Sequence, residues 1–365
     1  MNREKWVDIA KGIAIIAVVL GHIDFVYPDS KLLPLSDLLA EFWHVPVFFL
    51  IGGFFLKEDK LIYPISFIKG KIKHLYLLLI YIYVPVLLLH NLFISIGFYD
   101  IHQDYSGKNV TIWNGYELLL NILKAIFFAG REPILGAMWF VYVLFAALCL
   151  LSLLSWGINK MTIDKKRYKQ IRCIIFLSLA ILSCICTQLF NLTIPRFNNV
   201  FTASWLLYVG MLVNQRYRIQ YSSGFITALC VIVVFHLILL HKGSVALNTN
   251  RYDDVVILTI SSLSFLYIVC FFSKKIQDTY IGRTLCVIGK DSFYVMGLQF
   301  VGFKIGSVIL NYVGCDVALS SLKAPAGNNL LLFVFYLLMG TFIPIIIIYI
   351  VRFIRNSIVG FIANY

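Results

Sequence analysis

The first apolar segment of the chain carries side chains that could do acid–base chemistry inside a membrane. In DIAKGIAIIAVVLGH, residues 8–22, Asp8, Lys11 and His22 follow one face of a predicted helix at spacings of three and four residues, with apolar residues between them. Ionisable groups at membrane depth cost about 2.5–3.5 kcal/mol each and usually face a bundle interior or a wet cavity. Histidine titrates near neutral pH. The spacing therefore makes His22 a candidate functional residue.

Structural roles could also account for these three residues. Asp8 and Lys11 have the i,i+3 spacing of an ion pair whose side chains reach the interface. A buried His22 could simply be hydrogen-bonded to a backbone carbonyl. The alignment of His22 with the other two favours a cavity instead.

The second apolar segment, EFWHVPVFFLIGGFF at residues 41–55, repeats the pattern. Glu41 and His44 are three residues apart, and Gly52 and Gly53 follow. Adjacent glycines let helix backbones approach closely. If this segment runs inward, His44 lies in the outer half of the membrane together with His22. We expect the two histidines to share one pocket.

Two later segments add candidates. GAMWFVYVLF contains Trp139, for which an aromatic belt is the structural alternative. IGKDSFYVMGLQFVGFKIG contains Ser292, which could cap a helix, and places Gln299 and Lys304 at membrane depth. We expect Gln299 to act as a neutral hydrogen-bond donor rather than as a base, or else to form an interhelical amide bond. No metal-ligand spacing, nucleophile elbow or phosphate-binding loop occurs, so we predict no metal site.

Composition specifies the environment of these groups. Of 365 residues, 60% are hydrophobic and 13% charged, and the mean hydropathy is +0.86. These values exclude an ordinary soluble domain and indicate a polytopic membrane protein. Ten apolar runs predict an all-α fold of about ten transmembrane helices, forming a single domain over residues 1–365. They lie near 9–27, 39–56, 75–97, 138–157, 172–190, 202–214, 224–241, 254–273, 291–313 and 329–351. Residues 116–130 predict an interfacial or re-entrant helix.

The loop charges predict the orientation. With the N-terminus inside, 21 lysines and arginines fall on the inner side and 8 on the outer side. This asymmetry satisfies the positive-inside rule, so we expect both termini in the cytoplasm. It also explains the net charge of +13 without a nucleic-acid partner.

Four stretches together resemble the acyltransferase-3 family of integral-membrane acyltransferases. WVDIAKGIAIIAVVLGH is similar to its first-span signature, a basic residue about three turns ahead of a histidine. HVPVFFLIGGFF, GAMWFVYVLF and IGKDSFYVMGLQF resemble its later motifs in order and spacing. This chain has Lys11 where arginine is common, Gly52 where serine is common, and Gln299 where a histidine is frequent in the polysaccharide-modifying branch.

The resemblance implies an O-acyltransferase of the bacterial inner membrane. Its donor would be cytoplasmic acyl-CoA, commonly acetyl-CoA, as a co-substrate with no bound cofactor. The acceptor would be a hydroxyl of a cell-surface glycan or its lipid-linked precursor. His22 then takes the essential histidine position, Asp8 the acidic position before it, and Lys11 the basic position near the CoA phosphates. Glu41, His44, Trp139, Ser292 and Gln299 would line the substrate pocket.

Two questions stay open at this level. His22 could deprotonate the sugar hydroxyl as it attacks the thioester, or could first take the acyl group itself. Ten spans with polar groups near the midplane would also suit a carrier or flippase for a glycan-related substrate. A sensor or assembly protein that only binds glycan is a third possibility.

Overall fold

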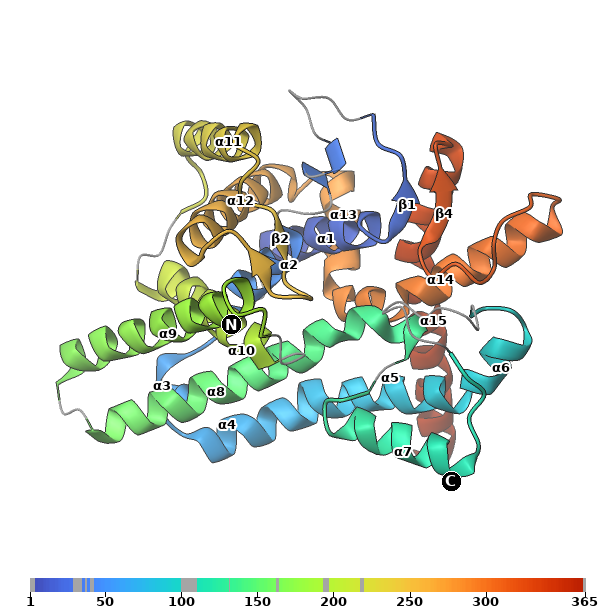
Figure 1. Ribbon diagram of the computed structural model, residues 1–365, viewed down its shortest axis with the longest axis horizontal. Helices are drawn as coiled ribbons and strands as arrows, with labels where there is room; N and C mark the ends of the chain where they lie inside the picture. The colour runs from blue at the N-terminus through green and yellow to red at the C-terminus, as the bar shows by residue number, and fades with distance from the viewer. Residues whose placement is uncertain are drawn as a thin grey trace. The chain divides into compact units, whose positions relative to one another are not determined.

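The computed structural model describes residues 4–28, 35–36, 38–39, 43–99, 110–130, 132–161, 164–192, 197–216 and 220–363. Helices dominate these residues (Figure 1). Packing divides the chain into two compact units. The first comprises Met1–Ala10, Pro28–Tyr81 and Met138–Arg283, and the second Lys11–Tyr27, Ile82–Ala137 and Thr284–Tyr365.

Most elements belong to one unit. The first unit contains α2 (His44–Phe54), α3 (Glu58–Leu61), α4 (Pro64–Lys71), the π-helix η2 (Ile72–Tyr76), α8 (Trp139–Met161), α9 (Lys165–Gln188), α10 (Phe197–Met211), the π-helix η4 (Leu212–Arg216), α11 (Gly224–Leu239), the hairpin strands β2 (Val245–Ala246) and β3 (Arg251–Tyr252), and α12 (Val255–Ile276). The second contains β1 (Ile23–Phe25), α6 (His90–Ser95), α7 (Gly115–Ile126), the 3₁₀ segment η3 (Pro133–Met138), α14 (Ser292–Tyr312), β4 (Ala324–Gly327) and α15 (Leu330–Ala363). Three α-helices contain residues of both units: α1 (Lys5–Leu20), α5 (Leu77–Leu88) and α13 (Tyr280–Lys290). The last residue of η3, Met138, also belongs to the first unit.

Close backbone contact between α2 and α10 organises the first unit. A Cβ added at Gly53 would lie 2.2 Å from the Leu207 carbonyl oxygen, and one added at Gly210 would lie 2.0 Å from that of Leu50. No real side chain tolerates such distances, so the two helices touch because both positions are glycine. The expectation from the glycine pair is thus confirmed at Gly53.

A buried polar network closes one end of the first unit. Thr202 of α10 contacts the Asn250 side chain and the Tyr252 hydroxyl, each at 2.9 Å, and Ser183 of α9 at 3.2 Å. Asn198 reaches Thr187 at 3.0 Å. These groups satisfy one another, which buried hydroxyls and amides require. The network is therefore a structural tie between α9, α10 and the β2–β3 hairpin.

Glycines also set the packing of the second unit, where α14 and α15 lie side by side (Figure 1). A Cβ at Gly302 would lie 2.4 Å from the Met339 carbonyl oxygen. One at Gly340 would lie 2.3 Å from the Phe303 ring and 2.9 Å from Val19 of α1. Helices α1, α14 and α15 thus meet around Gly340, about one turn below His22.

A short parallel strand pair continues from the end of α1. Ile23 pairs with Ala324 and Phe25 with Gly327, with an irregularity between Asp24 and Phe25. The Ala324 N–H donates to the His22 carbonyl at 3.1 Å. The chain therefore leaves helical structure at His22 and pairs with a segment about 300 residues later.

The predicted spans are confirmed in part. Six stretches are helical, long enough and apolar enough to cross a membrane: Pro64–Leu88, Pro133–Met161, Lys165–Gln188, Val255–Ile276, Ser292–Tyr312 and Leu330–Ser357. Helices α1, α2, α10 and α11 stand at the other four predicted positions but have only 16, 11, 15 and 16 residues. The span predicted at 9–27 is wrong in its end, because α1 stops at Leu20 and β1 follows. The helix predicted within 116–130 is present as α7, which begins with a capping box between Asn114 and Glu117.

Substitution of Gly210 tests the α2–α10 contact. We expect Gly210→Ala to lower the thermal stability of the purified protein, because its methyl group would overlap the Leu50 backbone and overpacking costs about 1–3 kcal/mol. Gly157→Ala in α8 is the matched control, since nothing lies within 4 Å of a Cβ there. Thermal unfolding in detergent measures both. Equal midpoints for the two variants would show that the helices are not held at backbone contact.

Candidate functional site

His22 lies in the turn directly after α1, with its side chain half-buried. Its Nδ1 is 2.8 Å from the Val18 carbonyl oxygen. A carbonyl can only accept, so Nδ1 must donate the proton. In the neutral ring this leaves the lone pair on Nε2, and the hydrogen bond fixes both the tautomer and the ring orientation. The sequence left open that His22 only bonds a backbone carbonyl. The bond to Val18 is present, but it engages Nδ1 alone and leaves Nε2 as the basic nitrogen of the neutral ring.

Gln299 and Phe300 of α14 stand beside this ring. The Phe300 ring meets the His22 ring edge-on, with centroids 4.9 Å apart, and the Gln299 amide interacts with His22. Gln299 is fully buried. Its Nε2 donates to the Met296 carbonyl at 3.1 Å, whereas its Oε1 has no partner in hydrogen-bond geometry among the described residues. The buried amide oxygen of Gln299 is thus available, within the described part of the chain, to interact with a group beside the His22 ring.

Lys304, one turn and a half further along α14, holds the loop that covers this region. It is buried, and its ammonium donates to the carbonyls of Ser321, at 2.8 Å, and Leu319. The Phe98 ring lies 5.7 Å from Nζ. Lys304 precedes the end of α14 by eight residues, about 12 Å. The loop therefore folds back along the helix and does not extend away from it.

The same loop leads into β4 and so to His22. Asn311 fastens it further, because its side chain bonds both the N–H and the carbonyl of Val317 at 2.8 and 2.9 Å. Lys323, exposed at the end of the loop, lies within electrostatic range of the His22 ring. Irregular backbone at membrane depth is tolerated only where protein buries it or it lines a wet cavity. The described surroundings of His22 thus include the strand β4, Lys323 and the side chains of Gln299 and Phe300.

A second histidine in this unit has the opposite bonding pattern. His90 Nδ1 is 2.9 Å from a Glu132 carboxylate oxygen, and its Nε2 is 3.1 Å from the Thr111 carbonyl oxygen. Tyr99 donates to the other Glu132 oxygen, and burial together with the Glu132 charge raises the pKa of Tyr99. Trp113 stacks on the His90 ring at 3.5 Å. Both nitrogens of His90 are occupied, so this cluster is a structural tie.

That tie supports the candidate site indirectly. Glu132 immediately precedes η3, and Gly136 of η3 lies against Phe300, with 3.9 Å from an added Cβ to the ring. Phe300 in turn contacts His22. The His90–Glu132 pair thus fixes the segment behind the aromatic neighbour of His22.

The remaining predicted site residues lie as follows. Asp8 is buried and Lys11 half-buried on α1. Ser292 opens α14, two turns or about 10 Å before Gln299. No side-chain cap bond occurs there, and the preceding Asp291 instead binds Arg352 of α15 at 2.6 Å. Ser292 thus neither caps the helix nor stands level with His22.

His44 and Trp139 belong to the first unit. His44 is the first residue of α2, after Trp43, which stacks on Phe265 of α12 at 5.5 Å. Trp139 is the first residue of α8 and packs near Phe140, which contacts Phe49 of α2. Glu41 lies outside the described residues. The shared pocket of His22 and His44 stays a prediction.

Sequence spacing singled out His22 and Gln299, which the structure places together, but it did not reveal the residues that hold them there. Lys304 was conspicuous as a charge at membrane depth, yet its acceptors are backbone carbonyls, which carry no residue signature. His90 and Glu132 are 42 positions apart, and Lys323 lies in a loop. Among the described residues, no group of three or more His, Cys, Asp or Glu side chains is placed to hold a metal ion.

Comparison with known proteins gives one match. The model of the acyltransferase-3 family, described as an acyltransferase domain, matches residues 4–349. No curated protein and no solved structure matches the chain.

Replacement of Lys304 tests the loop arrangement. We expect Lys304→Met to raise hydrogen exchange at the amides of Ala324 and Val26, which donate to the carbonyls of His22 and Gly327. The reason is that the carbonyls of Leu319 and Ser321 lose their donor, at a cost of about 1–3 kcal/mol each. Hydrogen exchange with mass spectrometry reads these peptides directly. Lys290→Met, which removes an exposed lysine at the end of α13, is the control. Unchanged protection of both peptides in Lys304→Met would show that the lysine does not hold β4 against β1.

Proposed function

The chain belongs to the acyltransferase-3 family, whose model covers nearly its whole length, and on that premise we propose that it is a membrane O-acyltransferase. It moves an acyl group, in the first instance acetyl, from cytoplasmic acyl-CoA to a hydroxyl of a cell-surface glycan or of its lipid-linked precursor. Its apolar helices suit a multi-pass protein of the bacterial inner membrane. The observation that supports the site assignment is the hydrogen bond from His22 Nδ1 to the Val18 carbonyl, which leaves the lone pair on Nε2.

His22 serves as the general base in this proposal. Its Nδ1 is held by the Val18 carbonyl, so the neutral ring presents Nε2 to an incoming hydroxyl. The hydroxyl oxygen attacks the thioester carbonyl carbon, Nε2 takes the hydroxyl proton, and the CoA sulfur leaves and recovers a proton. The same nitrogen could first accept the acyl group as an acyl-imidazole and then pass it to the hydroxyl. Both routes need a single basic nitrogen in a fixed direction.

The acyl donor would enter from the cytoplasmic end of α1. Lys11 would meet the phosphates of CoA as a point charge there, and the neighbouring Asp8 would orient Lys11. Lys11 and His22 are eleven residues apart, about 16 Å along a helix. That separation suits an extended pantetheine arm, with the nucleotide at Lys11 and the thioester at His22.

Gln299 would orient the acceptor. Its Nε2 carries two N–H groups, one of which donates to the Met296 carbonyl, and its amide oxygen has no hydrogen-bond partner among the described residues. A sugar hydroxyl could donate to Oε1 while it presents its lone pair to the thioester. Because glutamine does not titrate, Gln299 positions the acceptor without competing with His22 for the proton.

The family match favours this enzyme over a carrier or flippase, because the family is described by acyl transfer. An acyl-CoA transfer assay on the purified protein separates the two, since a carrier consumes no donor.

Replacement of His22 tests the catalytic assignment. We expect His22→Ala to lower acyl transfer about 10²–10⁴-fold, the usual effect of losing a general base, with normal abundance in the membrane. Transfer of labelled acyl groups from acyl-CoA to glycan measures the rate, and immunoblotting measures abundance. The control is His236→Ala, an exposed histidine of α11. Normal transfer by an abundant His22→Ala protein would remove His22 from the mechanism.

Replacement of Gln299 tests its role toward the acceptor. We expect Gln299→Leu to reduce turnover about two- to tenfold, the equivalent of one neutral hydrogen bond of about 0.5–1.5 kcal/mol. The loss should appear at every pH, whereas Gln299→His should retain activity and add a pH dependence near about 6.5. Steady-state rates across pH 5–8 distinguish these cases. Full activity in Gln299→Leu would show that Gln299 does not contact the acceptor and that its bond to Met296 is structural.

A further inference from the structure

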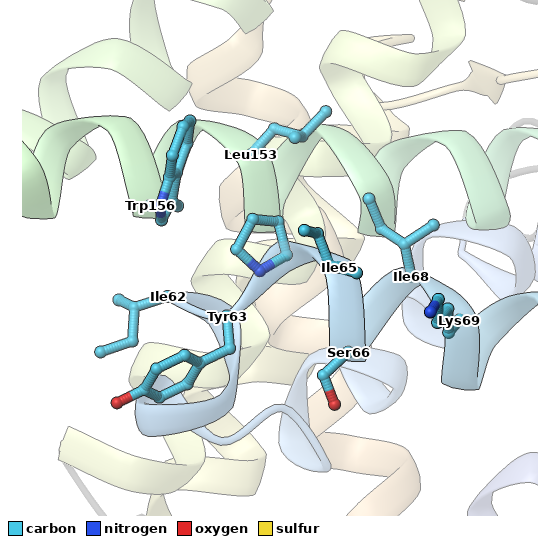
Figure 2. Close-up of a pocket in the computed structure, with 9 residues that line it drawn as sticks. Ile62, Tyr63, Ile65, Ser66, Ile68, Lys69, Leu153 and Trp156 are labelled. Atoms are coloured by element: carbon cyan, nitrogen blue, oxygen red, sulfur yellow. The ribbon is translucent and has the colours of Figure 1, made fainter.

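A groove of about 960 Å³ runs between α4 and α8 of the first unit. Figure 2 shows Tyr63 and Trp156 at one end, Ile65 and Leu153 in the middle, and Lys69 at the other end. Lys69 is the only charged residue among those that line it, and none is acidic. The groove is thus apolar along its length and cationic at one end.

The lining side chains are exposed to the surroundings of the protein. Ile65 is 72% exposed, Tyr63 66% and Trp156 38%. Water would disfavour such a surface, but lipid acyl chains would cover it without cost. Tyr63 and Trp156 could also belong to an ordinary aromatic belt at the membrane interface, which needs no concave surface. Here the same residue types line a concavity, which is the shape that retains one molecule.

A second positive charge stands at the aromatic end. The Lys160 ammonium lies 4.4 Å from the centre of the Trp156 ring. The nearby acid Glu58 is already engaged by Arg172 at 2.9 Å and by Lys169 at 3.9 Å. Glu58 therefore forms its ion pairs with other residues than Lys69, which lines the groove, and Lys160, which contacts Trp156.

We propose that this groove binds one anionic phospholipid of the leaflet on the lysine-rich side, which the loop charges predict to be cytoplasmic. An acyl chain lies along Ile65, Ile68 and Leu153, and the phosphate meets the Lys69 ammonium. Lys160 adds attraction over a longer distance. Charge complementarity selects an anionic lipid over a zwitterionic one, because basic sites between membrane helices favour anionic head groups. The proposal is independent of the proposed enzymatic activity.

Fluorescence quenching of Trp156 tests this site directly. The protein is reconstituted in phosphatidylcholine nanodiscs that contain a minor fraction of either chain-brominated phosphatidylglycerol or chain-brominated phosphatidylcholine. The chain has six tryptophans, so the Trp156 signal is the difference between the unaltered protein and Trp156→Phe. We expect brominated phosphatidylglycerol to act at about fivefold lower mole fraction, corresponding to about 1 kcal/mol for one lysine near the lipid.

Three variants assign the effect to the groove. Lys69→Gln should abolish the preference for phosphatidylglycerol, and Lys160→Gln should reduce it. Lys165→Gln, which removes an exposed lysine of α9 on the same side, should leave it unchanged. As a second measurement, phosphatidylglycerol should raise the thermal unfolding midpoint of the unaltered protein but not that of Lys69→Gln.

Two results would overturn the proposal. Equal quenching by both brominated lipids would reduce the groove to ordinary lipid-facing surface. Displacement of the quenching lipid by added palmitoyl-CoA at concentrations that leave its bilayer content unchanged would identify a soluble acyl-CoA as the occupant instead.

Discussion

The buried ammonium of Lys304 fixes the loop that leads to the strand beside His22. A charge at that depth is costly unless it is fully engaged, and Lys304 finds its acceptors in the backbone of the loop after α14. Asn311 holds the same loop, because its side chain bonds both the N–H and the carbonyl of Val317. β4, Lys323 and the strand pairing beyond His22 all follow from that fold-back.

Hydrogen bonding distinguishes His22 from His90 more clearly than burial does. His90 has an acceptor at each nitrogen, so neither nitrogen is available to a substrate. Its role is to fix Glu132 and the segment that follows. His22 has an acceptor at Nδ1, which orients the ring and leaves the lone pair of the neutral ring on Nε2. The first arrangement supports the second, through η3 and Phe300. One residue type thus provides the structural support at His90 and the proposed general base at His22.

Periodicity and spacing predicted the helical class, six of the spans and the proximity of polar groups from α1 and α14. These signals are local, since a helix repeats its own pattern. The end of α1 was misplaced because the apolar run continues to Phe25 while the backbone switches to strand pairing with Ala324, a partner that hydropathy does not reveal. The partners of Lys304 and His90 were also unreadable, because backbone carbonyls and a glutamate 42 residues away leave no spacing to detect. The roles of Asp8, Lys11 and His44 stay predictions.

The pairing of β1 with β4 has a consequence for biosynthesis. About 300 residues separate the two strands, and at roughly 5–20 residues per second the ribosome needs roughly 15–60 s to make them. Throughout that interval α1 can already be inserted, but the chain after His22 has no strand partner and its N–H and carbonyl groups must be sheltered by water or by an insertase. A nascent chain released before Ala324 would contain Asp8, Lys11 and His22 and still lack the strand that bonds the His22 carbonyl.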